Sequence, residues 1–242
     1  MPGGPAQQHR LGTHHFAWPA RSILKEPRSW LRHGVRFRPQ ESFPMTMLTL
    51  SALLWALGLP PFEAEFQSLF DGQTLTGWVG DTTGYVVRDG AITVTPQGRN
   101  LYTTEEYSDF VLRFEFKLTP GANNGLGIRT PPKGDAAYLG MELQILDSTH
   151  EKWANLKDWQ YHGSCYGIAP AEQGHLMPTG SWNRQEVTVK GSQVRVVLNG
   201  ATILDIDLEH VAPKGKTIDG RAHPGLRQKT GHICFCGHGD EV

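Results

Sequence analysis

The chain has 242 residues, of which 28 are Gly and 16 are Pro, and only 19% carry a charge. Gly and Pro together exceed their average share of roughly 12%, which argues against a helical bundle, and the 38% of apolar residues can bury one core, which excludes a disordered chain. The net charge of −1 conceals two unlike parts. Residues 1–46 hold seven basic and two acidic side chains, whereas residues 47–242 hold 16 basic and 22 acidic ones.

Residues 1–46 form the basic part, and they show neither the period of a strand nor that of a helix. Pro interrupts them repeatedly. Such a segment suits a nucleic-acid-binding arm, but it also suits upstream sequence translated from a start codon assigned too early. We favour the second reading and expect a disordered or wrongly assigned leader.

The 13 residues 47–59 carry no charge and are followed by Pro60, Pro61 and the small residue Ala64. A membrane-spanning helix needs about 20 apolar residues, whereas the apolar region of an export signal needs about 7–15. A short buried helix or an N-terminal anchor is the alternative. We therefore predict a signal peptide over residues 47–64, no stable membrane span, and a secreted or periplasmic domain over residues 65–242.

After residue 65 the apolar residues follow the period of a strand nearly throughout. Apolar and polar residues alternate without a fault over 110–118, which predicts a half-buried antiparallel strand. Asp89-Gly90 and Asn199-Gly200 predict hairpins over 85–95 and 193–207. Further strands are expected at 126–129, 138–146, 186–190 and 232–236. These elements predict an all-β, two-sheet jelly-roll sandwich.

The sequence stops directly after the last expected strand and its turn. A closing strand would normally follow, so we expect that the sequence is truncated or that one sheet edge stays unpaired. Three cysteines, Cys165, Cys234 and Cys236, have no zinc-site spacing, and we expect them to be buried thiols.

The most informative segment is 138–147, Y-L-G-M-E-L-Q-I-L-D. Its odd positions from Leu139 to Ile145 form an apolar face, so Glu142 and Gln144 point to the opposite face together with Tyr138. Asp147 is out of phase, but a bulge after Gln144 would return it to that side. Two carboxylates in a cleft suit general acid and base roles, and an ordinary solvated strand face is the alternative.

Other polar residues in unusual places extend this row into a possible cleft. Arg129 ends an apolar strand, where its charge needs a carboxylate or a ligand oxygen. His162 and Tyr166 lie in a Gly-rich loop, Trp182 precedes a strand, and His238 follows the last one. Aromatic rings that carry polar groups suit stacking on a sugar while hydrogen bonding its hydroxyls.

Seven segments together resemble one known family, the 3-keto-disaccharide hydrolase domain, formerly a domain of unknown function. They are F-x-S-L-F-D-G-x-x-L-T-G-W (66–78), N-N-G-L-G-I-R (123–129), G-M-E-L-Q-I-L-D (140–147), Y-H-G-S-C-Y-G (161–167), W-N (182–183), V-V-L-N-G (196–200) and G-H-I-C-F-C-G-H-G (231–239). The resemblance implies a concanavalin A-like jelly roll, common in exported proteins, with its site on a concave sheet. The residues that match the family's recurrent polar positions are Arg129, Glu142, Gln144, Asp147, Tyr166 and His238.

The 142–147 row, E-x-Q-x-x-D, also resembles the E-x-D-x-x-E strand of laminarinase-type retaining glycosidases, whose outer carboxylates are nucleophile and acid/base. Here the middle acid is an amide and the last is a shorter Asp, which argues against double displacement. A 3-keto sugar offers another route. Its ketone acidifies the C2 proton, so a base can form an enolate, the C1 substituent can leave with help from an acid, and water can add.

This route assigns provisional roles. Glu142 or His238 is the base, Arg129 and Gln144 stabilise the enolate oxygen, and Asp147 or Tyr166 lies near the leaving oxygen. We expect Asn124, His162 and Trp182 to help bind the substrate. No cofactor is needed, although a divalent cation held by Glu142, Asp147 and His238 could replace the Arg.

Two alternatives of other classes remain. One is a carbohydrate-binding, lectin-like module without catalysis, and the other is a structural domain whose polar row is merely solvated. The expected partner is a small-molecule carbohydrate. We do not expect nucleic acid as a partner, because the 65–242 region is acidic and has no basic stripe.

Overall fold

The structure is a computed structural model that describes residues 23–25 and 66–242. Apart from residues 23–25, the expected leader over 1–46 and signal peptide over 47–64 lie outside the described residues. Within the part that the structure describes, no helix is long and apolar enough to cross a membrane.

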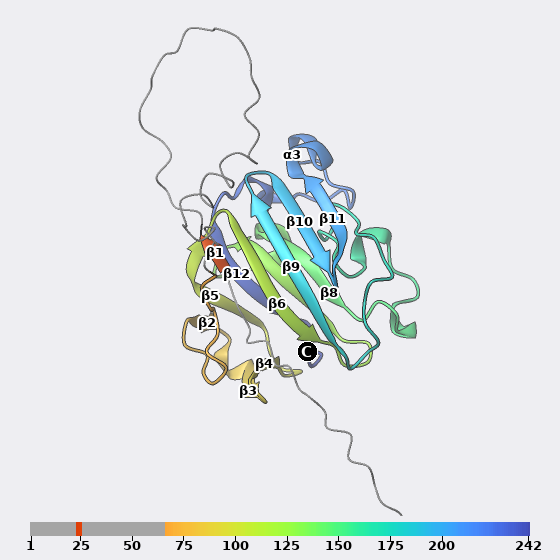
Figure 1. Ribbon diagram of the computed structural model, residues 1–242. Coiled ribbons are helices and arrows are strands. Elements are labelled where there is room, and N and C mark those ends of the chain that lie inside the picture. The colour runs from red at the N-terminus through yellow and green to blue at the C-terminus, as the bar shows by residue number, and fades with distance from the viewer. Residues whose placement is uncertain (1–22, 26–65) are drawn as a thin grey trace, which may run out of the picture.

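Two antiparallel five-stranded sheets lie face to face (Figure 1). The first, called the β9 sheet, has the order β1 (Ile23–Lys25), β6 (Phe110–Lys117), β9 (Trp182–Lys190), β10 (Gln193–Leu198) and β11 (Ala201–Asp207). The second, called the β12 sheet, has the order β2 (Trp78–Gly80), β5 (Asn100–Tyr107), β12 (Gly231–Gly237), β7 (Asn123–Thr130) and β8 (Met141–Leu146). This arrangement confirms the predicted all-β sandwich.

The remaining elements are short. β3 (Tyr85–Arg88) and β4 (Ala91–Val94) pair as a separate hairpin. The α-helices are α2 (Ala136–Leu139) and α3 (Leu208–Val211), and five 3-10 turns cover 82–84, 151–153, 158–160, 213–215 and 224–227. Both predicted hairpin turns form: Asp89 and Gly90 have φ of 51° and 75°, and Asn199 and Gly200 have φ of 50° and 91°. These left-handed pairs match the twist of the strands that they join.

The core lies between the two sheets. In β6 the alternation places Phe110, Leu112 and Phe116 in the interior, where they are buried. The facing sheet contributes Leu126 and Ile128 from β7, Met141, Leu143 and Ile145 from β8, and Ile233 from β12. Because one face of β7, β8 and β12 is used by this core, their polar side chains are left on the outer face of the β12 sheet.

The start of β8 differs from the prediction of a strand over 138–146. Residues Ala136–Leu139 form α2, since the Asp135 side chain accepts a hydrogen bond from Ala137 N and caps the helix. Leu139 is therefore 37% exposed and does not continue the core face. The short helix instead packs against β8 and β7.

The end of the chain returns to the β3–β4 hairpin. β12 lies between β5 and β7, and beyond it the backbone N of Val94 in β4 donates to the carbonyl of Val242 at 3.1 Å. No strand follows β12 among residues 66–242.

Candidate functional site

A groove with two adjoining halves crosses the outer face of the β12 sheet. Both halves are lined by Asp135, Glu142 and His238. The wide half, about 490 Å³, is also lined by Gly80, Asp81, Arg99, Asn100, Tyr102, Gly134, Ala136 and Gly237. The narrow half, about 280 Å³, is also lined by Asn123, Ala137, Tyr138, Gln144, Tyr166 and Arg221. The groove thus has Glu142 and His238 at its junction.

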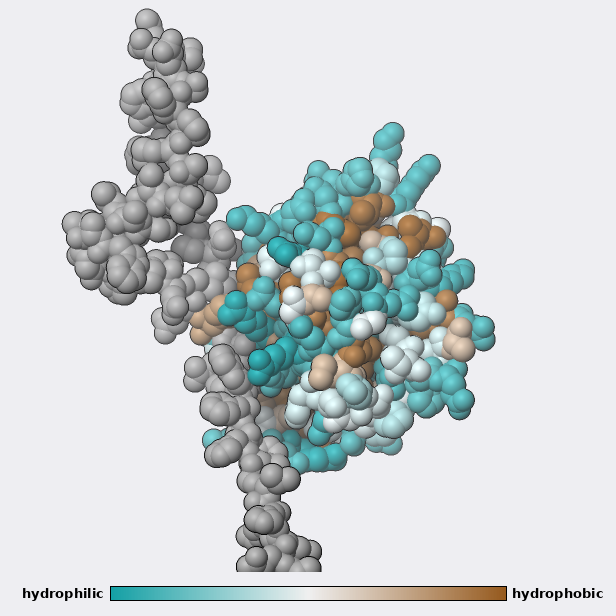
Figure 2. Space-filling model, turned by 45° about the vertical axis from the view of Figure 1, so that its right-hand side comes forward, coloured by the Kyte–Doolittle hydropathy of each residue, from teal (hydrophilic) through white to brown (hydrophobic). Residues whose placement is uncertain are grey.

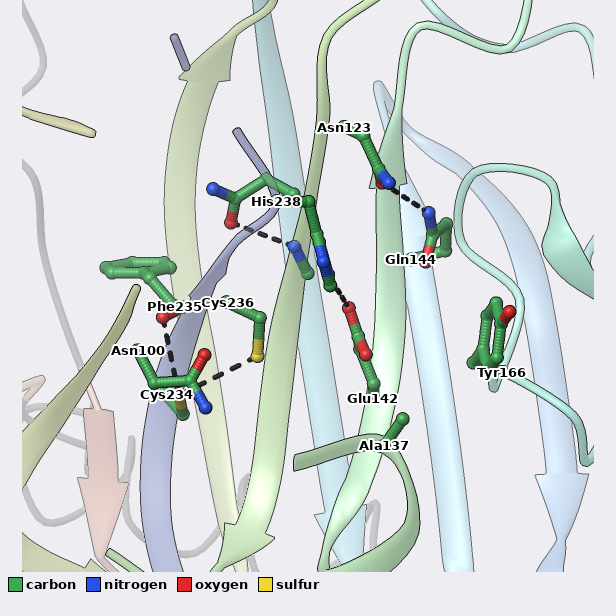
Figure 3. Close-up of polar contacts among 12 residues, drawn as sticks. Asn100, Asn123, Ala137, Glu142, Gln144, Tyr166, Cys234, Phe235, Cys236 and His238 are labelled. Atoms are coloured by element: carbon green, nitrogen blue, oxygen red, sulfur yellow. Dashed lines mark hydrogen bonds and ion pairs between the residues drawn. The ribbon is translucent and has the colours of Figure 1, made fainter. Parts of the chain in front are cut away.

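Glu142 and His238 are in direct contact at this junction. Glu142 projects from β8 and His238 follows the end of β12, and Figure 3 shows the carboxylate and the imidazole ring pointing toward each other. Glu142 Oε1 lies 3.0 Å from His238 Nε2. The Glu142 side chain is 5% exposed, whereas that of His238 is 40% exposed. The structure therefore brings together two of the predicted catalytic residues, one buried and one open to a ligand.

A glycine on β7 makes room for this contact. A Cβ placed on Gly125 would lie 1.7 Å from Glu142 Oε1. In the strand register Gly125 faces Gln144, not Glu142, so the Glu142 side chain leans diagonally across β7 to reach His238. The N-N-G-L-G-I-R segment therefore contributes to the site because Gly125 has no side chain.

The contact also sets the charge of the imidazole. The hydrogen bond to the Glu142 carboxylate raises the pKa of His238 above 6.5, and this effect outweighs the lowering caused by partial burial. A protonated His238 beside the carboxylate is a general acid in contact with a potential base.

Gln144 and Tyr166 lie on the narrow side of the groove (Figure 3). Gln144 Nε2 donates to Asn123 Oδ1 at 2.7 Å, while Gln144 Oε1 is buried and has no hydrogen-bond partner among the described residues. The Tyr166 hydroxyl accepts from Gln160 Nε2 at 3.3 Å. A buried amide oxygen without a donor is an acceptor that a ligand hydroxyl can satisfy.

The narrow half has a polar wall that the sequence did not reveal. The Arg221 guanidinium carbon lies 3.7 Å from the centroid of the Tyr138 ring, and Arg221 Nη1 donates to the Tyr138 hydroxyl. That hydroxyl donates to Asp219 Oδ2 at 3.2 Å, and His223 Nε2 lies 3.1 Å from the same oxygen. Asp219 and His223 are 81 and 85 positions from Tyr138, so only the folded chain shows this cluster. Its sole local signal is the Asp219-Gly220 turn, flanked by Thr217 and Arg221.

Two side chains of this wall, Tyr138 and Asp219, have pKa values that differ from their ordinary ones. Burial and the Asp219 carboxylate raise the pKa of Tyr138 to about 12. Burial alone would raise the pKa of Asp219, but hydrogen bonds from the Arg221 backbone, Thr217 and His223 together lower it to about 2. Tyr138 thus remains a neutral phenol and Asp219 an anion at neutral pH.

Arg129 does not reach the groove, contrary to the expectation that it stabilises an enolate. It is 3% exposed, has φ of 51°, and donates from Nε and Nη2 to Ser108 O at 3.2 and 3.0 Å. Its Nη2 also lies 3.3 Å from Asp109 Oδ1. Its charge is thus satisfied by the turn between β5 and β6. Burial lowers the pKa of Arg129.

Asp147 also lies away from Glu142. The bulge that would bring Asp147 to the same side does not form, because β8 keeps an unshifted register with β7 up to Leu146. The Asp147 carboxylate accepts hydrogen bonds from Gly121 N, Thr149 Oγ1 and Thr179 Oγ1. Burial opposes the lowering of its pKa, but these three bonds prevail. The trio of Glu142, Asp147 and His238 therefore does not converge, and no cluster of three such residues suited to a metal occurs in the described part of the chain.

Three of the expected substrate-binding residues are outside the groove. His162 is buried between the sheets, stacked on Phe116, with Nε2 3.1 Å from Gln185 Oε1, and burial lowers its pKa to about 4. Asn124 is buried and its Oδ1 accepts from Gly125 N. Trp182 begins β9 on the other sheet, where it is 50% exposed beneath Lys117. The three cysteines are buried free thiols, as predicted.

Comparison with known proteins agrees with this architecture. Residues 65–242 match the family described as the 3-keto-alpha-glucoside-1,2-lyase-like domain. The chain belongs to this family, which the resemblance of its seven segments had indicated.

Individual proteins that are similar to this chain share about a quarter of its residues in the matched region. A "3-keto-disaccharide hydrolase" of Bacteroides thetaiotaomicron is 25% identical over 63% of this chain, which spans 62% of that protein's length. Two crystal structures of a "putative glycosyl hydrolase" from Parabacteroides distasonis are 28% and 26% identical, with TM-scores of 0.63 and 0.62. They cover 72% and 69% of this chain, and 87% and 89% of their own chains are matched. The names of these relatives thus refer to hydrolases of sugars.

Proposed function

We propose that this protein cleaves the glycosidic bond of 3-keto-glycosides in the groove of the β12 sheet, with Glu142 as base and His238 as acid. The observation that carries the proposal is the 3.0 Å contact between a buried carboxylate and a more exposed imidazole whose pKa it raises. The family and the name of the Bacteroides relative support the substrate class.

The first half of the reaction is an elimination. Glu142 removes the C2 proton, and the electron pair of the C2–H bond forms an enolate with the C3 carbonyl. The ketone then re-forms, a C1=C2 double bond appears, and the C1–O bond breaks. His238 gives its proton to the leaving oxygen, so the products are an alcohol and an unsaturated 3-keto sugar.

The second half is the addition of water. The water hydroxyl bonds to C1 while His238 takes the remaining water proton, and Glu142 returns its proton to C2. Both side chains regain their starting states and the net reaction is hydrolysis. If the unsaturated sugar leaves before water adds, the same residues act as a lyase. Every step uses side chains of the groove and water.

The test compares a 3-keto-disaccharide with its unoxidised parent in D₂O. We expect turnover of the keto sugar only. Deuterium should appear at C2 of the hydrolysed product in those turnovers in which the Glu142 carboxyl exchanges its proton with solvent before returning it. Glu142→Gln should lower kcat about 10²–10⁴-fold, the usual contribution of a general base. The matched control is Glu115→Gln, since Glu115 pairs with Arg184 on the β9 sheet, and it should leave kcat unchanged.

A second function remains open, that of a carbohydrate-binding module. The unpartnered Gln144 oxygen and the groove would serve binding without chemistry. Equal turnover of both sugars would contradict the role of the ketone. Saturable binding with no turnover, and unchanged affinity in Glu142→Gln, would favour the binding module.

A further inference from the structure

The groove is divided at the residues proposed to break the bond. Glu142 and His238 line both halves, so a glycosidic bond placed beside them has one ring in the narrow half and the other substituent in the wide half. The two halves differ in their polar groups. The question is which half receives the ring that is deprotonated.

The narrow half presents a cation that is fixed before any ligand arrives. Arg221 stacks on Tyr138, and its backbone N donates to Asp219 Oδ1 at 2.9 Å. Asp219 in turn accepts from Tyr138 and pairs with His223, and the Asp219 and His223 side chains are 2% and 0% exposed. A stacked guanidinium anchored in this way loses little further freedom when it binds an anion. Only one of its five N–H donors has a partner among the described side chains and backbone, namely the Tyr138 hydroxyl.

The same half presents a buried acceptor. Gln144 is 4% exposed, and its Oε1 has no donor in the described structure. Arg donates only, so it can bind a carbonyl or enolate oxygen and stabilises the charged enolate most, whereas an amide oxygen accepts only from a donor such as a hydroxyl. A 3-keto ring offers both, because its C3 oxygen is a pure acceptor and the neighbouring carbons carry hydroxyls. An unoxidised ring offers a hydroxyl at C3 instead.

We propose that the narrow half binds the oxidised ring, with Arg221 donating to the C3 oxygen and Gln144 accepting from a ring hydroxyl, while the wide half receives the leaving group. This inference rests on the proposed function. Arg221 then meets the negative charge that develops on the C3 oxygen in the enolate, which is the role first expected of Arg129. Tyr138, Asp219 and His223 act as positioning residues for it.

The test uses Arg221→Gln, with Arg195→Gln as the matched control because Arg195 is an exposed arginine on β10 of the other sheet. Titration calorimetry with 3-ketoglucose and with glucose measures binding of the single ring. Steady-state kinetics with 3-keto-glucosides of different leaving groups measure turnover. Thermal melting confirms that each variant is folded.

We expect Arg221→Gln to lower kcat/KM about 10²-fold, the cost of removing one oxyanion donor, by the same factor for every leaving group. It should weaken 3-ketoglucose at least tenfold and weaken glucose by a smaller factor, because the C3 hydroxyl of glucose can also accept from Arg221. Tyr138→Phe keeps the stacked ring but removes the hydroxyl, so a smaller loss of kcat/KM is expected. Arg195→Gln should match the parent in both measurements.

The outcomes separate the two proposals. If the parent is active and Arg221→Gln stays within threefold of it, the assignment of the narrow half is wrong and the proposed function stands. If the parent binds 3-ketoglucose through Arg221 but turns over no 3-keto-glycoside, the assignment stands and the reaction is wrong. If the parent neither binds nor cleaves these sugars, both are contradicted.

Discussion

The largest influence on the charge of His238 is Glu142, while the carboxylates of Asp135 and Asp240 raise the pKa of the imidazole further. Its Nε2 contacts Glu142 Oε1, and the hydrogen bond to that carboxylate raises the pKa of the imidazole. In the proposed reaction the imidazole acts as the acid, and this contact favours its protonated form. The pH optimum should therefore have an alkaline limit set by His238, above the ordinary histidine value of 6.5.

An NMR titration of the His238 ring measures this coupling. We expect a midpoint above 6.5 in the parent and a lower one in Glu142→Gln, which removes the charge but keeps the shape. Glu115→Gln should leave the midpoint where it is. An unchanged midpoint in Glu142→Gln would show that the carboxylate does not control the imidazole.

The same shift affects stability in a defined direction. A histidine whose pKa is raised in the folded state stabilises the fold at pH values below the unfolded pKa of 6.5. This contribution is lost as the pH rises through the higher folded-state pKa. The protein should thus lose some unfolding free energy on the alkaline side of 6.5, and Glu142→Gln should lose less.

At the scale of elements, β7 supplies space as well as side chains. Gly125 leaves room for the Glu142 carboxylate, while Gly127 is bordered by Thr130 and Cys234. The two glycines lie two residues apart on the same face of the strand. They therefore make a matched pair in which only one touches the catalytic carboxylate.

We expect Gly125→Ala to lower kcat/KM about 10²-fold, the loss that a misplacement of about 1 Å can cause. The new methyl group would displace Glu142 from His238. Gly127→Ala should instead cost about 1–3 kcal/mol of stability by crowding its neighbours, with kcat/KM nearly preserved. Kinetics and urea unfolding of both variants check this. Equal activity of the two variants would contradict the diagonal path of Glu142.

β8 shows how far a strand can be predicted. The alternation of Met141, Leu143 and Ile145 with Glu142 and Gln144 fixed which side chains share the outer face, and the structure confirms it. The bulge after Gln144 that would have returned Asp147 to the row does not form, because a bulge depends on the partner strand and not on the pattern of one strand. The start at Tyr138 was wrong because the Asp135 cap favours a helical turn.

At the scale of the whole molecule, Arg129 has a structural role, because it connects the end of β7 to the turn between β5 and β6. From the end of β7 in one sheet it bonds to Ser108 and Asp109, in the turn that leads from β5 of the same sheet into β6 of the other. Asp109 Oδ1 also accepts from Gly191 N, in the turn between β9 and β10. Arg129 therefore helps to hold one end of the sandwich together.

Arg129→Gln should accordingly reduce the unfolding free energy by about 1.5–3 kcal/mol, the range for hydrogen bonds to a charged group. Its kcat/KM should equal that of the parent at temperatures where both are folded. Urea unfolding and kinetics on the same preparation provide the two values. A large loss of kcat/KM without a loss of stability would return Arg129 to the catalytic role.

The face in Figure 2 is largely hydrophilic, with hydrophobic residues in scattered groups. Trp182 is the exposed aromatic residue that seemed suited to a sugar, yet it lies on the β9 sheet, while the groove lies on the β12 sheet. Exposed aromatic residues at a strand end carry no information about which sheet holds the site.

The sequence by itself determined the local features: the alternation of the strands, the two hairpin turns, and the shared face of Glu142 and Gln144. These follow from backbone geometry and from neighbours a few residues apart. Only the tertiary structure decided that His238 meets Glu142, that Arg129 and Asp147 are occupied elsewhere, and that Arg221 lines the groove. Such contacts join residues as many as 96 positions apart. They depend on strand order and register, which pack the core of both sheets at once and which no single segment encodes.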